Sequence, residues 1–173
     1  EGGQTQRVEG SVDFQKSNFL RLEHRHPEPQ TLVGDGQWLW IHRHSTNQVI
    51  KTKFEDWKKS EPLAQGLLDF GNYAGLLKTY DVTLSSVQAA GRDGHLAFSL
   101  VLKPRGKSGA FMLTLRLSTR EYFPSDTELR AGQVTVRSIF KNIRYNPRHP
   151  EGHFLFVPPK NADVFENLNP KAP

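Results

Sequence analysis

Apolar and polar side chains alternate with a period of two along most of this 173-residue chain. Successive side chains of a β-strand point to opposite faces of a sheet, so this alternation is typical of strands that are buried on one side. Turn residues such as Gly, Pro, Asn and Asp separate the alternating stretches. The pattern therefore predicts about eleven strands, at residues 4–14, 19–25, 30–33, 38–41, 48–53, 82–90, 96–103, 111–118, 127–131, 134–145 and 153–157.

One of these stretches, Trp38-Leu39-Trp40-Ile41, is apolar on both faces. In a strand, the two tryptophans point to one side, whereas Leu39 and Ile41 point to the other. We interpret this as a strand that is covered on both sides, with one pair lining a pocket and the other meeting a loop or a cover. The sequence leaves open which pair does which.

The middle of the chain has the spacing of short helices instead. Residues 54–59 form the first such segment and residues 62–70 the second, which begins with a proline that suits a first helical turn. The apolar stripe of the second segment consists of Leu63, Leu67, Leu68 and Phe70. A third segment, 72–80, has an apolar face made of Tyr73, Leu76, Leu77 and Tyr80.

Together these elements predict a mainly β protein with short helices (α+β class) in a single domain, 1–173. Strands joined in sequence order by short turns favour one large antiparallel sheet that curves strongly, with the helices on one face. The concave side of such a sheet has to be filled by the protein's own side chains or by a ligand. The polar tail, 167–173, is expected to fray.

Composition narrows the classes of protein to consider. The chain contains no cysteine, which excludes disulfides, thiolate catalysis and cysteine-ligated zinc. Its formal net charge is +5, but the basic residues are scattered and form no long run. Nucleic-acid binding would need a clustered basic face, so we predict no nucleic-acid partner.

The sequence offers few candidate residues for catalysis or metal binding. His24 with His26, and His42 with His44, form two His-x-His pairs, which on a strand place both imidazoles on one face. No carboxylate falls at a convincing third position, so the sequence predicts no metal and no cofactor. The chain also lacks Gly-x-Ser-x-Gly and phosphate-binding glycine motifs. We therefore predict that the protein is not an enzyme.

Four stretches in this order resemble the family of outer-membrane lipoprotein carriers (LolA-like proteins). They are GSVDFQKSNFLRLE at 10–23, PQTLVGDGQWLWI at 29–41, PLAQGLL at 62–68 and FLFVPPKNADV at 154–164. The resemblance runs from about residue 6 to residue 166, and the second stretch is the most recognisable of the four. It departs from the family pattern at Lys16-Ser17, where the family has Arg-Pro.

The resemblance implies an incomplete barrel closed by a helical lid over an apolar cavity. It further implies a periplasmic, monomeric carrier whose cavity takes the acyl chains of lipoproteins. Such a carrier receives acylated lipoproteins from an ATP-driven releasing complex of the inner membrane and passes them to an outer-membrane acceptor. Lys16 takes the place of the family's gating arginine. The family's N-terminal helix and first strand are expected to be missing, because the chain begins at Glu1-Gly2-Gly3.

The apolar positions on strands and helices supply the candidate lining of the lipid cavity. These candidates are Leu20, Leu22, Leu39, Ile41, Leu67, Leu68, Leu76, Leu77, Phe98, Leu100, Leu113 and Leu115. Each could instead be ordinary core, as we expect for Phe154 and Phe156. Alternative functions are a related lipid-binding module with another cargo, such as a glycolipid shuttle or an envelope-stress sensor domain, and an interaction domain with a fully packed interior.

Overall fold

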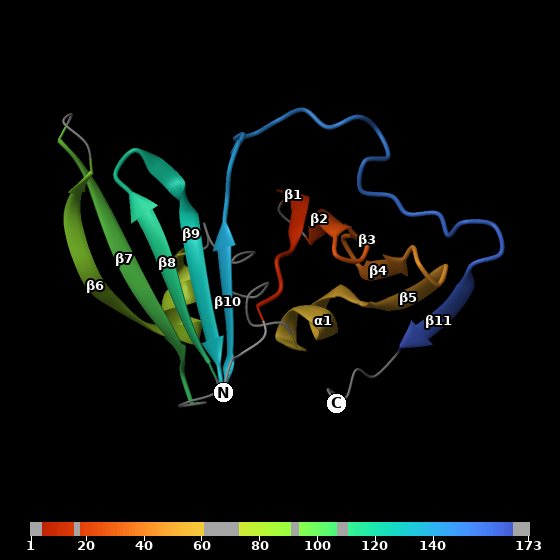
Figure 1. Cartoon of the computed structure of the whole chain (residues 1–173), viewed down its shortest axis with the longest axis horizontal. Coiled ribbons are helices and arrows are strands. Elements are labelled where there is room, and N and C mark those ends of the chain that lie inside the picture. Colours follow the sequence, from red (N-terminus) through yellow and green to blue (C-terminus); the bar gives the residue numbers. More distant parts are fainter. Residues whose placement is uncertain (1–4, 16–17, 61–72, 91–93, 107–110, 168–173) are drawn as a thin grey trace. The chain divides into compact units, whose positions relative to one another are not determined.

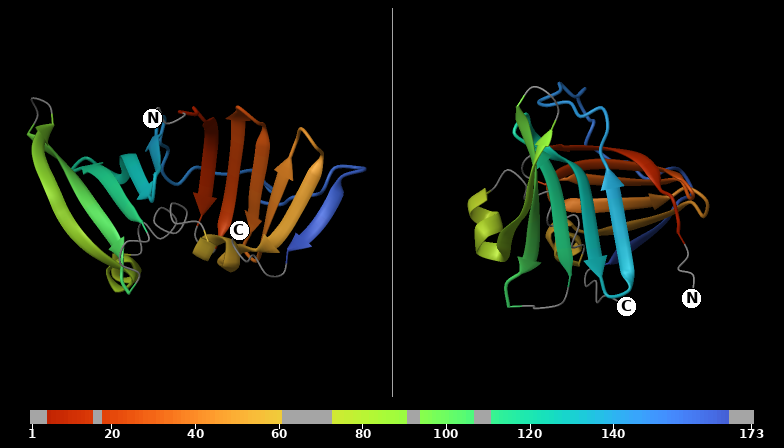
Figure 2. Two further views of the ribbon diagram at one scale, coloured as in Figure 1. Left: turned by 60° about the horizontal axis from the view of Figure 1, so that its bottom comes forward. Right: turned by 60° about the vertical axis from the view of Figure 1, so that its left-hand side comes forward.

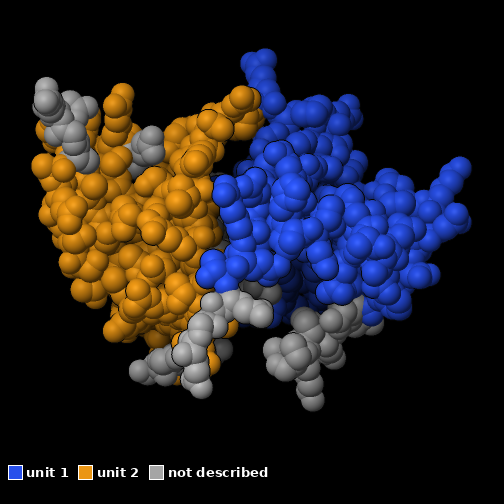
Figure 3. All heavy atoms as spheres, viewed as in Figure 1, with its two compact units in different colours: residues 1–60, 148–173 blue, residues 61–147 orange. Residues whose placement is uncertain are grey.

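The computed structural model describes residues 5–15, 18–60, 73–90, 94–106 and 111–167. Two compact units make up the chain (Figure 3), and the described strands of each unit form one β-sheet. Unit 1 consists of residues 1–60 and 148–173, and unit 2 of residues 61–147. Each unit has its own core, so each is described separately below.

Unit 1 is built on a six-stranded sheet (Figure 1). Its strands are β1 (Glu9–Gln15), β2 (Phe19–His26), β3 (Gln30–Asp35), β4 (Trp38–Arg43), β5 (Gln48–Lys53) and β11 (Asp163–Asn167). The first five form an antiparallel meander in sequence order, whereas β11 joins the outer edge of β5 in parallel. Short turns between alternating stretches explain the meander, since a hairpin needs only a few turn residues.

The turn between β3 and β4 depends on the carboxylate of Asp35. Its Oδ1 accepts hydrogen bonds from the backbone N–H groups of Gln37 (3.0 Å) and Trp38 (2.8 Å), and Oδ2 accepts one from the indole Nε1–H of Trp40 (3.1 Å). Burial acts to raise the pKa of Asp35, but these hydrogen bonds outweigh it, so the pKa lies below its ordinary value of 3.8. The folded state therefore favours the ionised carboxylate.

Replacing this carboxylate should destabilise the protein in a pH-dependent way. We expect Asp35→Ala to lower the free energy of unfolding at pH 7 by about 1–2 kcal/mol, because three donors lose their acceptor. The pKa is lowered in the folded state, so the stabilisation is fully present above the ordinary value of 3.8 and is lost as the pH falls through the folded pKa. Urea denaturation at pH 7 and below pH 3 measures both effects. Glu28→Ala, at an exposed turn position, is the control, and equal stability of Asp35→Ala and wild type at pH 7 would contradict the prediction.

Helix α1 (Phe54–Ser60) follows β5 directly and packs on one face of this sheet. The side chain of Phe54 is 1% exposed and lies over Gly34, where a Cβ atom would come within 2.7 Å of Cδ2 of the phenyl ring. The absence of a side chain at position 34 thus makes room for Phe54. Leu20 and Leu39 are also buried. Both pair with Gly34 in the register of the neighbouring strands, so their side chains lie on the face that carries Phe54.

The opposite face of the same sheet is covered by residues 148–162, called the trailing segment here (Figure 2). Phe154 packs on Phe19 of β2 with ring centroids 5.6 Å apart, and Phe156 stacks on Trp40 of β4 at 5.7 Å. The side-chain amide of Asn47 donates to the carbonyl of Asn161 (3.0 Å), after which β11 begins. The tryptophan side of β4 therefore meets a loop, whereas the Leu39 and Ile41 side belongs to the face that carries α1.

The predicted strand at 153–157 is wrong, because these residues form a turn and irregular chain outside any sheet. Their alternating aromatic residues reflect packing of Phe154 and Phe156 onto the sheet rather than pairing along its edge. Both are partly buried, but neither is among the fully buried core residues. The strand that occupies the far edge of this sheet, β11, was not predicted.

The described residues of unit 2 form a five-stranded, fully antiparallel sheet and the short helix α3 (Figures 1 and 2). In sheet order its strands are β10 (Val134–Ile139), β9 (Glu121–Ala131), β8 (Met112–Ser118), β7 (His95–Pro104) and β6 (Tyr80–Ala90). Helix α3 (Tyr73–Thr79) leads directly into β6. The core contains Leu76, Tyr80, Leu102, Leu113, Leu115, Leu117 and Leu129.

The predicted mainly β class with short helices is confirmed, but the prediction of one continuous antiparallel sheet is wrong. The described strands form two sheets, and neither is closed into a barrel. The outer edge of β5 is taken by the parallel strand β11, so β6 cannot pair there and starts a second sheet. The strand predicted at 134–145 ends at Ile139, and Asn142 and Asn146 that follow have positive φ angles.

Several predictions lie outside the described residues: the helix at 62–70, Lys16 and most of the tail at 167–173. The assignment of the chain to a single domain stays a prediction. Within the described residues, neither α1 nor α3 has the length and apolar character that a membrane-crossing helix requires.

Candidate functional site

One face of the six-stranded sheet carries an apolar row that crosses every strand. Register pairs connect the members of this row from β1 to β11. They are Val12, Leu22, Leu32, Ile41, Ile50 and Phe165. Phe54 of α1 packs on this same face, yet both ends of the row stay open to solvent, with Val12 39% and Phe165 53% exposed. Phe14, next to Val12 on the same face of β1, is 39% exposed.

The five-stranded sheet has an equivalent row on one of its faces. Its members are Val82, Leu102, Leu113, Leu129 and Val136, one from each strand. Leu76 of α3 packs on this face as part of the core. Away from the helix the face remains apolar but uncovered, and its exposed members are Leu84, Val87, Leu96, Val134 and Val136.

Each sheet therefore presents one apolar face that its described helix covers only in part. Scattered exposed leucines are ordinary on protein surfaces, but contiguous apolar patches mark binding sites or interfaces. Leu84 and Val87 are more than half exposed although they share a face with the core residues Leu113 and Leu115. We take these two apolar faces as the candidate functional site.

Ten of the twelve predicted cavity residues lie within the described part of the chain, and all except Leu77 are at least partly buried. Leu20, Leu22, Leu39 and Ile41 share the apolar face of the six-stranded sheet, and Phe98, Leu100, Leu113 and Leu115 share that of the five-stranded sheet. Of the helical candidates, Leu76 is buried, whereas Leu77 is 59% exposed. Leu67 and Leu68 lie outside the described residues. Their role in lining a lipid cavity stays a prediction.

The other face of the five-stranded sheet is polar. Asp126 accepts hydrogen bonds from Nε (3.1 Å) and Nη2 (2.8 Å) of Arg137, which raises the pKa of that guanidinium above its ordinary value. Arg116 lies 3.8 Å from the same carboxylate. A hollow of about 320 Å³ is lined by Ser86, Gln88, Ala97, Phe98, Ser99 and Arg116. This lining is too polar to suit hydrocarbon, so we do not assign the apolar ligand site to it.

Neither of the two His-x-His pairs belongs to a group of three possible metal ligands within the described residues. The rings of His42 and His44 stack with centroids 4.5 Å apart, but their neighbours are Asn47 and Thr31 rather than carboxylates. A different group, Asp13 with His149 and His153, does bring three possible ligands together. Sequence reasoning missed it, although two histidines four residues apart beside Pro150 were a visible signal.

These features define a class of protein: a mainly β chain of two antiparallel-rich sheets, each with an apolar face only partly covered by a short helix. Residues 1–157 match the protein family described as "Outer membrane lipoprotein carrier protein LolA". The chain belongs to this family.

Individual relatives agree with the assignment. The chain is 31% identical over 163 residues to the outer-membrane lipoprotein carrier protein of Dechloromonas aromatica, covering 94% of this chain and 74% of that one. It is 30% identical over 168 residues to the protein of the same name from Methylibium petroleiphilum, covering 95% and 75%. A crystal structure of an uncharacterized conserved protein from Thermus thermophilus superposes with a TM-score of 0.52 at 15% identity, covering 92% of this chain and 82% of that one. That likeness concerns the fold alone.

Proposed function

We propose that this protein is a lipoprotein carrier that shelters acyl chains against the apolar faces of its two sheets. The observation that carries the proposal is the apolar row across every strand of each sheet, with exposed members such as Leu84 and Phe165. Each methylene that leaves water contributes about 0.8 kcal/mol. An acyl chain laid along such a face would bury both its own surface and these exposed side chains.

The helices act as a lid in this proposal. Both α1 and α3 have seven residues, and helices this short depend on tertiary packing for stability. A helix held by a few side chains such as Phe54 or Leu76 can move away at moderate cost and uncover more of the apolar face beneath it. Because moving the helix costs free energy, the measured affinity for the cargo is weaker than that of the open form. Release of the cargo therefore remains possible.

We base the proposed setting of the carrier on its family. Relatives named outer-membrane lipoprotein carrier protein support a lipoprotein as the cargo. We infer that the protein works as a monomer in the periplasm, taking acylated lipoproteins from an ATP-driven releasing complex of the inner membrane to an acceptor at the outer membrane. It carries out no covalent chemistry in this role, so we propose that it is not an enzyme.

Binding of matched cargo tests the proposal. We expect the purified chain to bind a triacylated lipoprotein and a fluorescent fatty acid, and to bind the deacylated form of the same lipoprotein at least ten-fold more weakly, because the methylenes supply the binding free energy. Fluorescence titration measures the affinities, and native mass spectrometry counts the bound chains. Equal affinity for the two lipoprotein forms would overturn the proposal. A preference for glycolipid over lipoprotein would instead assign a different cargo to the same faces.

A further inference from the structure

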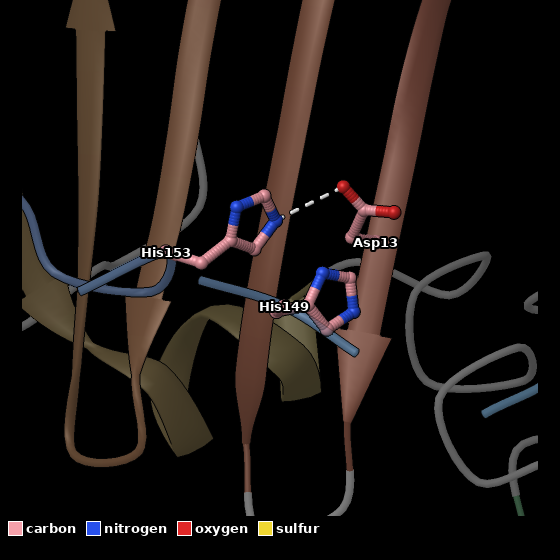
Figure 4. A group of neighbouring side chains, drawn as sticks. All are labelled: Asp13, His149 and His153. Atoms are coloured by element: carbon pink, nitrogen blue, oxygen red, sulfur yellow. Dashed lines mark hydrogen bonds and ion pairs between the residues drawn. The ribbon is translucent and has the colours of Figure 1, made fainter. Parts of the chain in front are cut away.

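Three side chains that can ligate a metal converge where the trailing segment crosses the first strand (Figure 4). Asp13 comes from β1, whereas His149 and His153 come from the trailing segment. The carboxylate Oδ2 of Asp13 lies 3.0 Å from Nε2 of His153. One ligand atom from each of the three residues lies within 4.8 Å of the other two. All three belong to unit 1, so their arrangement does not depend on where unit 2 lies.

The surroundings hold these side chains in place. The rings of His149 and His153 are nearly parallel, with centroids 4.4 Å apart, and both meet the edge or face of Phe154 at about 5 Å. Phe154 in turn packs on Phe19, while Nη1 of Arg21 donates to the carbonyl of His153 (3.3 Å). These ring contacts and the hydrogen bond to the backbone of His153 restrict how the two histidine side chains can turn.

We propose that Asp13, His149 and His153 bind one divalent transition metal ion of the zinc class. Two imidazoles and one carboxylate are a ligand set that suits Zn²⁺, Cu²⁺, Ni²⁺ and Co²⁺, whereas Ca²⁺ and Mg²⁺ prefer sites made of oxygen alone. Zinc sites with three protein ligands complete their coordination with water. The side chain of Asp13 is 43% exposed and that of His153 20% exposed, so an ion can reach both from solvent.

The local charge is compatible with a cation. Arg21 contacts this group through the carbonyl of His153, and its Nε lies 3.0 Å from the carboxylate of Glu23, which offsets its positive charge. An ion at this position would replace the direct contact between Asp13 and His153 with two metal–ligand bonds. It would thereby fasten the trailing segment to β1, at the edge of the sheet opposite to the one that β11 occupies.

Metal titration of the full chain, made without a histidine tag and treated with chelator, tests the site. We expect isothermal titration calorimetry with Zn²⁺ to show one ion per chain, and Co²⁺ to give the visible absorption of a site with nitrogen and oxygen ligands. Asp13→Asn, His149→Gln and His153→Gln should each weaken Zn²⁺ binding at least ten-fold. Saturating Zn²⁺ should raise the Tm of the wild type but not of these variants, because an ion that binds only the folded state stabilises it.

The double variant His42→Gln with His44→Gln is the matched control, because it removes the other stacked pair of rings, which has no carboxylate partner in the described structure. We expect it to bind Zn²⁺ as the wild type does. Circular dichroism verifies that each variant is folded. Absence of Zn²⁺ and Co²⁺ binding to the wild type would overturn the proposal, as would loss of binding in the His42 and His44 variant alone. The proposed lipid-binding surface is a different face of the sheet. Whether or not the chain binds Zn²⁺, the proposed carrier function is therefore unaffected.

Discussion

Leu84→Glu should weaken binding of a fluorescent fatty acid at least ten-fold while the folded state keeps its stability. Leu84 lies on the apolar face of β6, aligned with Leu100, and is 57% exposed. A glutamate here is hydrated in the free protein, so unfolding free energy should change by less than about 0.5 kcal/mol. An acyl chain covering the same position would have to remove water from the carboxylate, which costs several kcal/mol, and about 1.4 kcal/mol already corresponds to a factor of ten.

Thr83→Glu is the matched control for this experiment. Thr83 is the preceding residue of the same strand, is exposed, and points to the opposite face. Fluorescence titration of wild type and both variants gives the comparison. If Thr83→Glu loses as much affinity as Leu84→Glu, the apolar face is not the binding surface. The same substitution at Leu113 would be uninformative, because that side chain is fully buried in the core and a carboxylate there would destabilise the fold.

Phe54→Ala should lower the free energy of unfolding by about 3–5 kcal/mol, the range found for truncating a buried phenylalanine. Phe54 is 1% exposed, fills the space over Gly34 and meets Trp57 edge to face at 5.6 Å. Its removal leaves a cavity between α1 and the sheet that the backbone of β3 and β4 cannot fill. The expected loss is a large part of the stability of a typical domain. Chemical denaturation measures it directly.

A second variant tests the same contact from the sheet side. Gly34→Ala should destabilise the protein by about 1–3 kcal/mol, because the new methyl would overlap the Phe54 ring and lie 2.8 Å from the backbone oxygen of Asn18. Val157→Ala, at a position 83% exposed in the same unit, is the control and should change stability little. Wild-type stability in Phe54→Ala would show that α1 does not depend on this contact.

The strands themselves were predictable from local alternation. The predicted stretch at 48–53 matches β5, and the stretch at 111–118 matches β8 to within one residue. The helix at 54–59 was also predicted to within one residue of α1. These elements depend on side chains two to four positions apart, which the sequence displays directly.

Edge pairing was not predictable in this way. Nothing in the residues 163–167 distinguishes a strand that joins β5 in parallel from a polar loop, because the pairing depends on where the trailing segment ends. For the same reason the sequence could not tell that β6 starts a new sheet. The contact between Asp13 and His153 spans 140 positions, so neither residue indicates the other in the sequence.

By itself, the sequence determined the period of each strand, the position of the short helices and the fact that Trp38, Leu39, Trp40 and Ile41 need cover on both faces. Only the tertiary structure decided that the tryptophans meet the trailing segment and that Leu39 and Ile41 share the face of α1. The physical reason is that alternation is set within a strand by local backbone geometry. The partner on each face comes from chain segments that are distant in sequence and reach it only when the protein folds.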